Sequence, residues 1–163
     1  MAMVAELATR RLRLSTFGPS DAADLHVLFS DPRTHTIGGG PFTSIGQTGR
    51  WLARRDQVRA DLGFVWYGVR LNGTLIGNCG VFPGRTGAVE PEIGYLIHWP
   101  FQGRGFAGEA VGALLGECRR AGIGRVWATI RERNAASRRI VERHGMSLIR
   151  TELEDLLFYA LKF

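Results

Sequence analysis

The sequence predicts one α/β domain in which several strands form a single sheet. Three observations support this prediction. The chain has 163 residues, a length typical of one compact domain, and no linker, internal repeat or low-complexity block divides it. Strand-like and helix-like patterns alternate along it, and 45% hydrophobic with 22% charged residues is ordinary for a globular protein. We therefore expect residues 1–163 to form a single domain.

Seven segments have the alternating or continuous apolar pattern of β-strands. They are residues 12–17, 64–71, 74–82, 89–99, 125–131, 146–151 and 156–163. Four segments combine apolar residues at helical spacing with helix-start or helix-end residues. They are residues 20–31, 43–62, 103–121 and 134–144. The predicted order is a strand, two helices, a meander of three strands, a helix, a strand, a helix and two strands.

Turn residues mark several of the predicted boundaries. Asn72-Gly73 separates two strand-like segments and favours a tight hairpin, because both central residues of that turn need positive φ. Gly63 and Gly145 follow two expected helices, where glycine forms a left-handed C-cap. A meander followed by strand–helix–strand units implies a partly parallel sheet, and ligands favour the crevice where the strand direction changes.

The net charge of +6 comes almost entirely from arginine, since Lys162 is the only lysine. Arginine binds phosphates and carboxylates, so the charge fits a nucleic acid, an acidic protein surface or a phosphorylated cofactor; genomic base composition explains it equally well. No apolar run is long enough to span a bilayer, and the first residues do not resemble a signal peptide, so we expect a cytoplasmic protein. Cys79 and Cys118 have no paired spacing and are expected to be reduced core thiols.

The most informative segment is Gly103-Arg104-Gly105, which joins an expected strand to an expected helix. Glycine lets backbone amides approach a bound group closely, and the first turn of a helix has unpaired amide hydrogens and a partial positive charge. Together these features suit a phosphate or pyrophosphate. The segment lacks the third glycine of the dinucleotide motif and the Gly-Lys-Ser/Thr ending of a nucleotide-triphosphate loop. Taken alone, it fits either an anion site or a tight turn that binds nothing.

The segment Gln102-Gly103-Arg104-Gly105-Phe106-Ala107 resembles the Gln/Arg-x-x-Gly-x-Gly/Ala signature of the GNAT N-acetyltransferase superfamily. Residues 7–14, 92–95, 108–110 and 134–137 resemble its RimJ/RimL-like branch, so the similarity extends over nearly the whole chain in order. The resemblance implies a single mixed, mostly antiparallel sheet with helices on both faces, and acetyl-CoA as acetyl donor. Pro100 is a departure, since many members have proline where Trp99 stands.

The resemblance also implies how acetyl-CoA binds. Backbone amides of the loop would hold its pyrophosphate, the preceding strand would pair with its pantetheine arm, and Asn134 would contact that arm. The cofactor-binding residues expected on this basis are Leu96, Ile97, Gln102, Gly103, Arg104, Gly105, Phe106, Ala107, Asn134 and Ser137.

Acetyl transfer to an amine is helped by a base that neutralises the amine and an acid that protonates the leaving thiolate. Glu90 and Glu92 are two residues apart on an expected strand, so both side chains would lie on one face. Many family members have a catalytic glutamate on the equivalent strand, and we expect Glu92 to be the base; the alternative is a structural carboxylate. We expect Ser137 to be the acid, because the resemblance places its hydroxyl near the thioester sulfur; the alternative is a backbone contact in the first helical turn.

The expected acceptor is a primary amine, on a protein N-terminus or a small molecule, that attacks the thioester directly. In the family the segment around His35 lines the acceptor site, so His35 is a candidate acceptor contact. No histidines have metal-ligand spacing, so we expect no metal site. The alternative function is a non-catalytic CoA-binding regulatory domain, and a third class, a basic RNA-binding domain, lacks an RNA motif. We expect no membrane or direct nucleic-acid partner, and a monomer or homodimer.

Overall fold

The computed structural model describes residues 2–34 and 40–163. Within these residues eight strands form one sheet, in the order β1-β2-β3-β4-β5-β6-β8-β7. The strands are β1 (Glu6–Ala8), β2 (Arg13–Ser15), β3 (Trp66–Leu71), β4 (Thr74–Phe82), β5 (Glu92–Ile97), β6 (Arg125–Arg131), β7 (Ser147–Glu152) and β8 (Leu156–Lys162). The helices are α1 (Asp21–Ser30), α2 (Ile45–Leu62), α3 (Phe106–Arg120) and α4 (Ala135–Arg143), with a short 3₁₀ turn at Trp99–Phe101.

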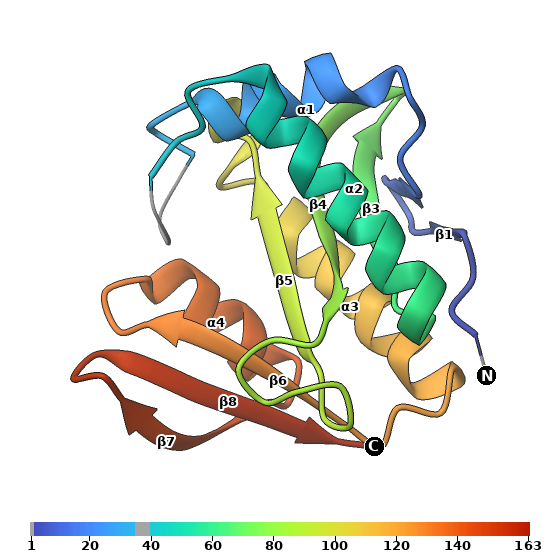
Figure 1. Ribbon diagram of the computed structural model, residues 1–163. Coiled ribbons are helices and arrows are strands. Elements are labelled where there is room, and N and C mark those ends of the chain that lie inside the picture. The colour runs from blue at the N-terminus through green and yellow to red at the C-terminus, as the bar shows by residue number, and fades with distance from the viewer. Residues whose placement is uncertain (1, 35–39) are drawn as a thin grey trace.

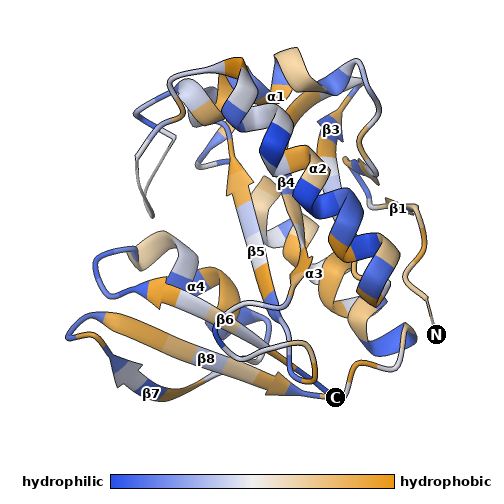
Figure 2. Ribbon diagram, in the orientation of Figure 1, coloured by the Kyte–Doolittle hydropathy of each residue, from blue (hydrophilic) through white to orange (hydrophobic). Residues whose placement is uncertain are grey.

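Helices cover both faces of this sheet. Helix α1 packs against α2 and β4, whereas α3 packs against β4, β5 and α4. In Figure 1, α2 crosses in front of β3 and β4 while α3 lies behind them. Figure 2 shows the strands coloured largely as apolar and α2 largely as polar. The predicted mixed, mostly antiparallel sheet with helices on both faces is therefore confirmed.

One pair of neighbouring strands departs from the antiparallel pattern. Strands β5 and β6 run parallel and share a single register pair, Glu92 with Trp127, whereas β4 and β5 are paired over six positions. Figure 1 shows β5 and β6 diverging from the point where they meet. The crevice expected where the strand direction changes lies between these two strands.

Local turn chemistry explains where most elements begin and end. The hairpin between β3 and β4 has positive φ at Asn72 (48°) and Gly73 (83°), as its sequence predicted. Gly63 ends α2 with a φ of 73°, and Gly145 follows α4 with a φ of 84°. At the start of α2, the Gln47 side chain accepts a hydrogen bond of 3.0 Å from the Ser44 amide.

Two predicted boundaries differ from the structure by three residues. Helix α3 begins at Phe106 rather than at residue 103, because the glycines before it have positive φ and cannot continue a helix. Strand β5 begins at Glu92 rather than at residue 89, because residues 83–91 form a turn-rich loop in which Val89 is 93% exposed. A short strand, β1, also pairs with β2 at the start of the sheet.

The main core lies between the sheet and helices α3 and α4. Cys79 and Cys118 are free and fully buried in it, and burial raises the pKa of Cys118 to about 12. A second apolar cluster, with Leu25 and Phe29 of α1, fills the opposite face. In the described part of the chain, no helix has the length and apolar character needed to span a membrane.

Candidate active site

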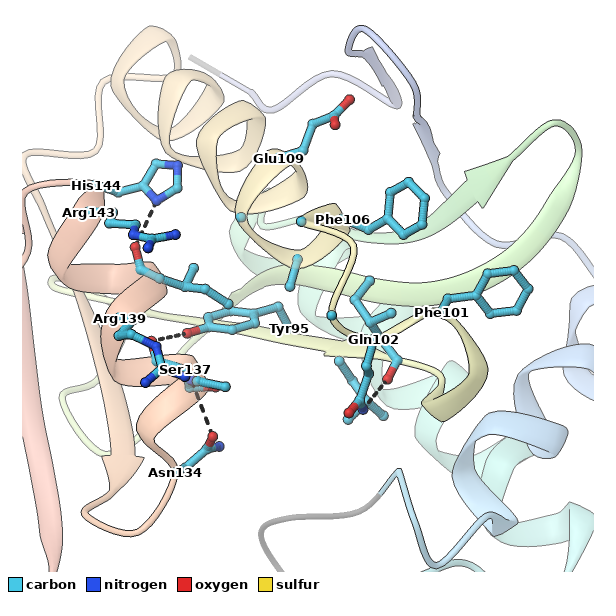
Figure 3. Close-up of a pocket in the computed structure, with 18 of the residues that line it drawn as sticks. Tyr95, Phe101, Gln102, Phe106, Glu109, Asn134, Ser137, Arg139, Arg143 and His144 are labelled. Carbon is cyan, nitrogen blue, oxygen red and sulfur yellow. Dashed lines mark hydrogen bonds between the residues drawn. The ribbon is translucent and has the colours of Figure 1, made fainter.

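A cleft of about 500 Å³ opens where β5 and β6 separate. Its walls are the end of β5, the turn into α3, the first residues of α3, and α4 (Figure 3). Most of the expected cofactor-binding residues line it: Leu96, Ile97, Gln102, Gly103, Gly105, Phe106, Ala107, Asn134 and Ser137. Arg104 and Glu92 are not among its lining residues. The structure thus brings together two segments, 96–107 and 134–137, that are separate in the sequence.

The turn before α3 presents backbone amides to this cleft. Gly103 and Gly105 have φ values of 77° and 81°, in the left-handed region that favours glycine. The first bond within the helix runs from the Glu109 amide to the Gly105 carbonyl (3.1 Å), so the preceding amides have no partner inside the helix. A Cβ atom at Gly103 would meet nothing within 4 Å, which leaves open space above the turn. Unpaired amides, a helix N-terminus and open space fit a bound diphosphate.

Arg104 supports the turn from outside the cleft. Its guanidinium lies 4.9 Å from the Phe106 ring centre, and its carbonyl accepts a hydrogen bond of 3.0 Å from Arg11. Arg11 in turn forms an ion pair of 2.7 Å with Glu109 on α3. Burial opposes ionisation of Glu109, but hydrogen bonds from Thr9 and Arg11 hold its pKa below the ordinary value. The segment before β2 therefore fixes the position of the N-terminus of α3.

Gln102 has a different role from the amides around it. Its side-chain amide donates a hydrogen bond of 2.8 Å to the Ile97 carbonyl, which closes the end of β5. The Trp99 amide donates a bond of 3.0 Å to the Thr34 hydroxyl, so the 3₁₀ turn is also tied to the segment after α1. Pro100 lies inside this turn, where its ring is compatible with the backbone.

Ser137 lies on the wall opposite the glycine turn (Figure 3). Its amide donates a hydrogen bond of 3.2 Å to the side chain of Asn134, the N-cap of α4, and its carbonyl accepts one of 3.1 Å from the Tyr95 hydroxyl. Its own hydroxyl faces the Tyr95 hydroxyl, and a hydrogen bond between the two side chains lowers the pKa of Tyr95 against the larger effect of burial. Burial raises the pKa of Tyr95 to about 12, so Tyr95 is a neutral donor near pH 7. Asn134 and Tyr95 therefore hold the backbone of Ser137 from two sides, and its hydroxyl lies beside that of Tyr95.

The structure places Glu92 outside the cleft. Its side chain is 1% exposed, and its carboxylate accepts hydrogen bonds from the Arg85 amide and from the Thr129 hydroxyl (2.9 Å). A Cβ atom at Gly84 would collide with this carboxylate, so the loop backbone packs directly on it. The carboxylate therefore links β5, β6 and the loop between β4 and β5. Its role as a base stays a prediction.

The other glutamate considered as a base lies in the loop. Glu90 precedes β5 and accepts a hydrogen bond of 2.8 Å from the Trp127 indole, so it does not lie on the strand that carries Glu92. The loop backbone turns through Gly87 at a φ of 86°, which ends the alternation of a strand. The Trp66 ring covers the face of β5 at Gly94, so a substrate cannot lie against this glycine.

Polar side chains connect the segment after α1 to the end of β5. His98 lies 3.2 Å from the Asp31 carboxylate, which also forms an ion pair of 2.9 Å with Arg33. Hydrogen bonds from the side chain and backbone of Arg33 hold the pKa of Asp31 well below its usual range. His35, the candidate acceptor contact, lies outside the described residues. Residues 2–34 and 40–163 contain no group of three or more His, Cys, Asp or Glu side chains that could hold a metal.

Comparison with known proteins defines the class to which this fold and cleft belong. The sequence model of the acetyltransferase (GNAT) domain matches residues 11–147, so the chain belongs to the GNAT acetyltransferase family. It is accordingly an acetyltransferase.

Solved structures with the same fold include three acetyltransferases. One from Agrobacterium tumefaciens is 23% identical and has a TM-score of 0.84, with 98% of this chain and 95% of that chain covered. The yncA protein of Salmonella typhimurium, solved with acetyl-CoA, is 22% identical over 94% of each chain, with a TM-score of 0.77. The ribosomal α-N-protein acetyltransferase RimL, solved with coenzyme A, is 20% identical over 96% of each chain, with a TM-score of 0.81. At these identities the similarity is one of fold.

Proposed function

We propose that this enzyme transfers the acetyl group of acetyl-CoA to a primary amine by direct attack of the amine on the thioester. The acceptor is a small amine or a protein N-terminus, as in the RimJ/RimL-like branch that the sequence resembles. The observation that carries the proposal is the cleft between β5 and β6, which has an amide-lined turn on one wall and Ser137 on the other. A requirement for acetyl-CoA, an intracellular thioester, supports the expectation of a cytoplasmic enzyme.

The residues of the cleft divide into an anion-binding end and a transfer end. Backbone amides of residues 103–107, at the positive end of the α3 dipole, bind the diphosphate of the donor. Backbone groups of Leu96 and Ile97 pair with its extended arm, since β5 has no strand partner on this side beyond Glu92 among the residues that the structure describes. Asn134 contacts the same arm from the start of α4. When bound, acetyl-CoA supplies the thioester carbon that the amine attacks.

Two side chains are assigned to proton movement and positioning. The Ser137 hydroxyl donates a proton to the departing thiolate, and the neighbouring Tyr95 side chain positions it. Glu92 holds β5, β6 and the loop around Arg85 in position, because both of its oxygens accept bonds from those elements. If Glu92 also takes a proton from the acceptor, its removal will change the pH dependence of the reaction.

Isothermal titration with acetyl-CoA tests this proposal. We expect the wild type to bind in the micromolar range and Gly103→Glu to lose binding, because the new carboxylate would occupy the diphosphate position. Gly87→Glu is the matched control, since Gly87 also has positive φ (86°) and open space around its Cβ position, but lies in the loop before β5. If Gly103→Glu binds acetyl-CoA as tightly as Gly87→Glu does, or if the wild type does not bind it, the proposed function is contradicted.

A further inference from the structure

Two buried side-chain atoms have no hydrogen-bond partner among residues 2–34 and 40–163: Nε of Arg55 and Nδ2 of Asn78. Both atoms are donors, and both side chains contact the indole of Trp66. The Trp66 Nε1 donates a hydrogen bond of 3.0 Å to Asn78 Oδ1, and the Arg55 guanidinium lies 4.6 Å from the Trp66 ring centre. Buried donors are normally paired, so this site is short of acceptor oxygens.

The orientation of the Asn78 amide follows from its one hydrogen bond. The indole N–H of Trp66 only donates, so the oxygen of Asn78 must face it and the nitrogen must point elsewhere. Asn78 is 2% exposed, and its nitrogen is therefore an enclosed donor with a fixed direction. A neutral amide of this kind suits a carbonyl or carboxylate oxygen.

Arg55 is a cation that aromatic rings surround and that no carboxylate neutralises. Its guanidinium lies 4.8 Å from the Trp51 ring centre and 5.7 Å from that of Phe82, and it pairs with no acidic side chain in the described ranges. Burial, and then repulsion from Arg54, lowers the pKa of Arg55 to about 10, so the group is still charged at neutral pH. Arg55 is half-buried and its buried Nε has no acceptor among the described residues, so an anion would supply the missing partner.

This pair of donors lies beside the cleft, on the face of the sheet opposite α3. Trp66 lies flat on the backbone at Gly80 and Gly94, where a Cβ atom would be 2.6 Å from its ring. Gly94 directly precedes Tyr95, which lines the cleft. Figure 1 shows α2, which carries Arg55, on the face opposite α3 and its glycine turn. Asn78 is also the register partner of Leu96 on β5, which lines the cleft, so a molecule bound at Asn78 would lie next to the cleft wall.

We propose that Arg55 and Asn78 bind a carboxylate carried by the amine acceptor. This inference rests on the proposed function and adds a substrate class to it. A carboxylate has two planar oxygens that match a guanidinium and can also accept from an amide N–H. The rings of Trp51, Trp66 and Phe82 suit an apolar remainder. A polyamine would instead place a positive charge beside the unpaired Arg55 cation.

Matched pairs of acceptors test the proposal in the wild-type enzyme. L-phenylalanine is compared with L-phenylalaninamide, and a peptide beginning Ala-Glu with one beginning Ala-Gln, so that a free amino acid and an acidic peptide are distinguished as sources. We expect at least one carboxylate member to exceed its amide partner by about 10-fold or more in kcat/KM, as a charged hydrogen bond implies. Equal use of both members in both pairs overturns the inference.

Variants then test whether Arg55 causes the preference for a carboxylate acceptor. Arg55→Gln is expected to remove it through a higher KM for the carboxylate acceptor, with kcat changed less, whereas Arg54→Gln on the exposed face of α2 keeps it. Arg55→Lys keeps the charge without the planar fork and is expected to retain part of it. If Arg55→Gln keeps the preference, the assignment to Arg55 is wrong.

A binding measurement separates this inference from the proposed function. Titration of acetyl-CoA shows whether each variant retains the donor site, and titration of N-acetyl-L-phenylalanine and its amide into the CoA-loaded wild type measures carboxylate recognition without turnover. Loss of acetyl-CoA binding in the wild type sinks the proposed function. Intact acetyl-CoA binding with no preference for the carboxylate sinks only the inference.

Discussion

The Tyr95 hydroxyl donates a hydrogen bond of 3.1 Å to the backbone carbonyl of Ser137, and this contact joins β5 to α4 across the cleft (Figure 3). The two elements belong to opposite sides of the point where the sheet divides. The bond therefore sets the separation between the strand expected to bind the donor's arm and the helix that carries the proposed acid.

Replacing Tyr95 by Phe removes this bond, and we expect the free energy of unfolding near pH 7 to fall by about 1 kcal/mol. Because burial raises the pKa of Tyr95 from its ordinary value of 10 to about 12, its contribution is present below pH 10 and is lost as the pH rises toward 12. Urea unfolding of both proteins should show their difference in stability narrowing above pH 10. A variant as stable as the wild type near pH 7 would contradict this assignment.

Replacing Ser137 by Ala is expected to lower kcat by about 10²-fold, the lower end of the effect of a general acid, with little change in acetyl-CoA affinity. The backbone contacts of this residue do not involve its hydroxyl, so the fold should be kept. Steady-state kinetics and acetyl-CoA titration measure the two quantities separately. Ser147→Ala, at an exposed position on β7, is the control, and an unchanged kcat in Ser137→Ala would rule out the acid role.

Replacing Glu92 by Gln is expected to destabilise the protein by about 1–3 kcal/mol, since one of the two buried bonds would then face an N–H group instead of an acceptor. If Glu92 only positions its neighbours, the pH dependence of kcat/KM keeps its shape. A base role predicts that the acidic limb of that profile disappears. Glu90→Gln, two residues earlier and 39% exposed at the side chain, is the matched control.

Replacing Asp31 by Asn is expected to lower the melting temperature at neutral pH. Arg33 holds the pKa of Asp31 below its ordinary value of 3.8, so the stabilisation is present above that pH and is lost as the pH falls further. Thermal unfolding across this range should show the difference from the wild type shrinking on acidification. Asp56→Asn, at an exposed position on α2, is the control.

The order of the elements could be predicted from the sequence because hydrophobic spacing and turn residues act locally. The hairpin at Asn72-Gly73 and the end of α2 at Gly63 are set by backbone angles that their own residues favour. The start of β5 could not be predicted in this way, because the path of residues 83–91 depends on tertiary contacts. One of them joins Glu90 and Trp127, which lie far apart in the sequence. Alternation alone does not show where a strand begins.

The same distinction applies to the site. The glycine turn is continuous in sequence, and its backbone angles at Gly103 and Gly105 follow from residue type. No local pattern indicates that Glu109 meets Thr9, or that Arg55 stacks on Trp66, because each pair is brought together by the tertiary fold. Glu109 and Arg55 could be singled out from the sequence only as charges on helices.

The single register pair between Glu92 and Trp127 is the weakest connection in the sheet and divides it into two groups of strands. Strands β1–β5 form the first group, and β6–β8 form the second. Local opening follows such units, so amide hydrogen exchange should report two protection classes in the ligand-free enzyme. A donor molecule lying between them would couple the two, and its occupancy would be detectable in the slowed exchange of β8, a strand that does not line the cleft.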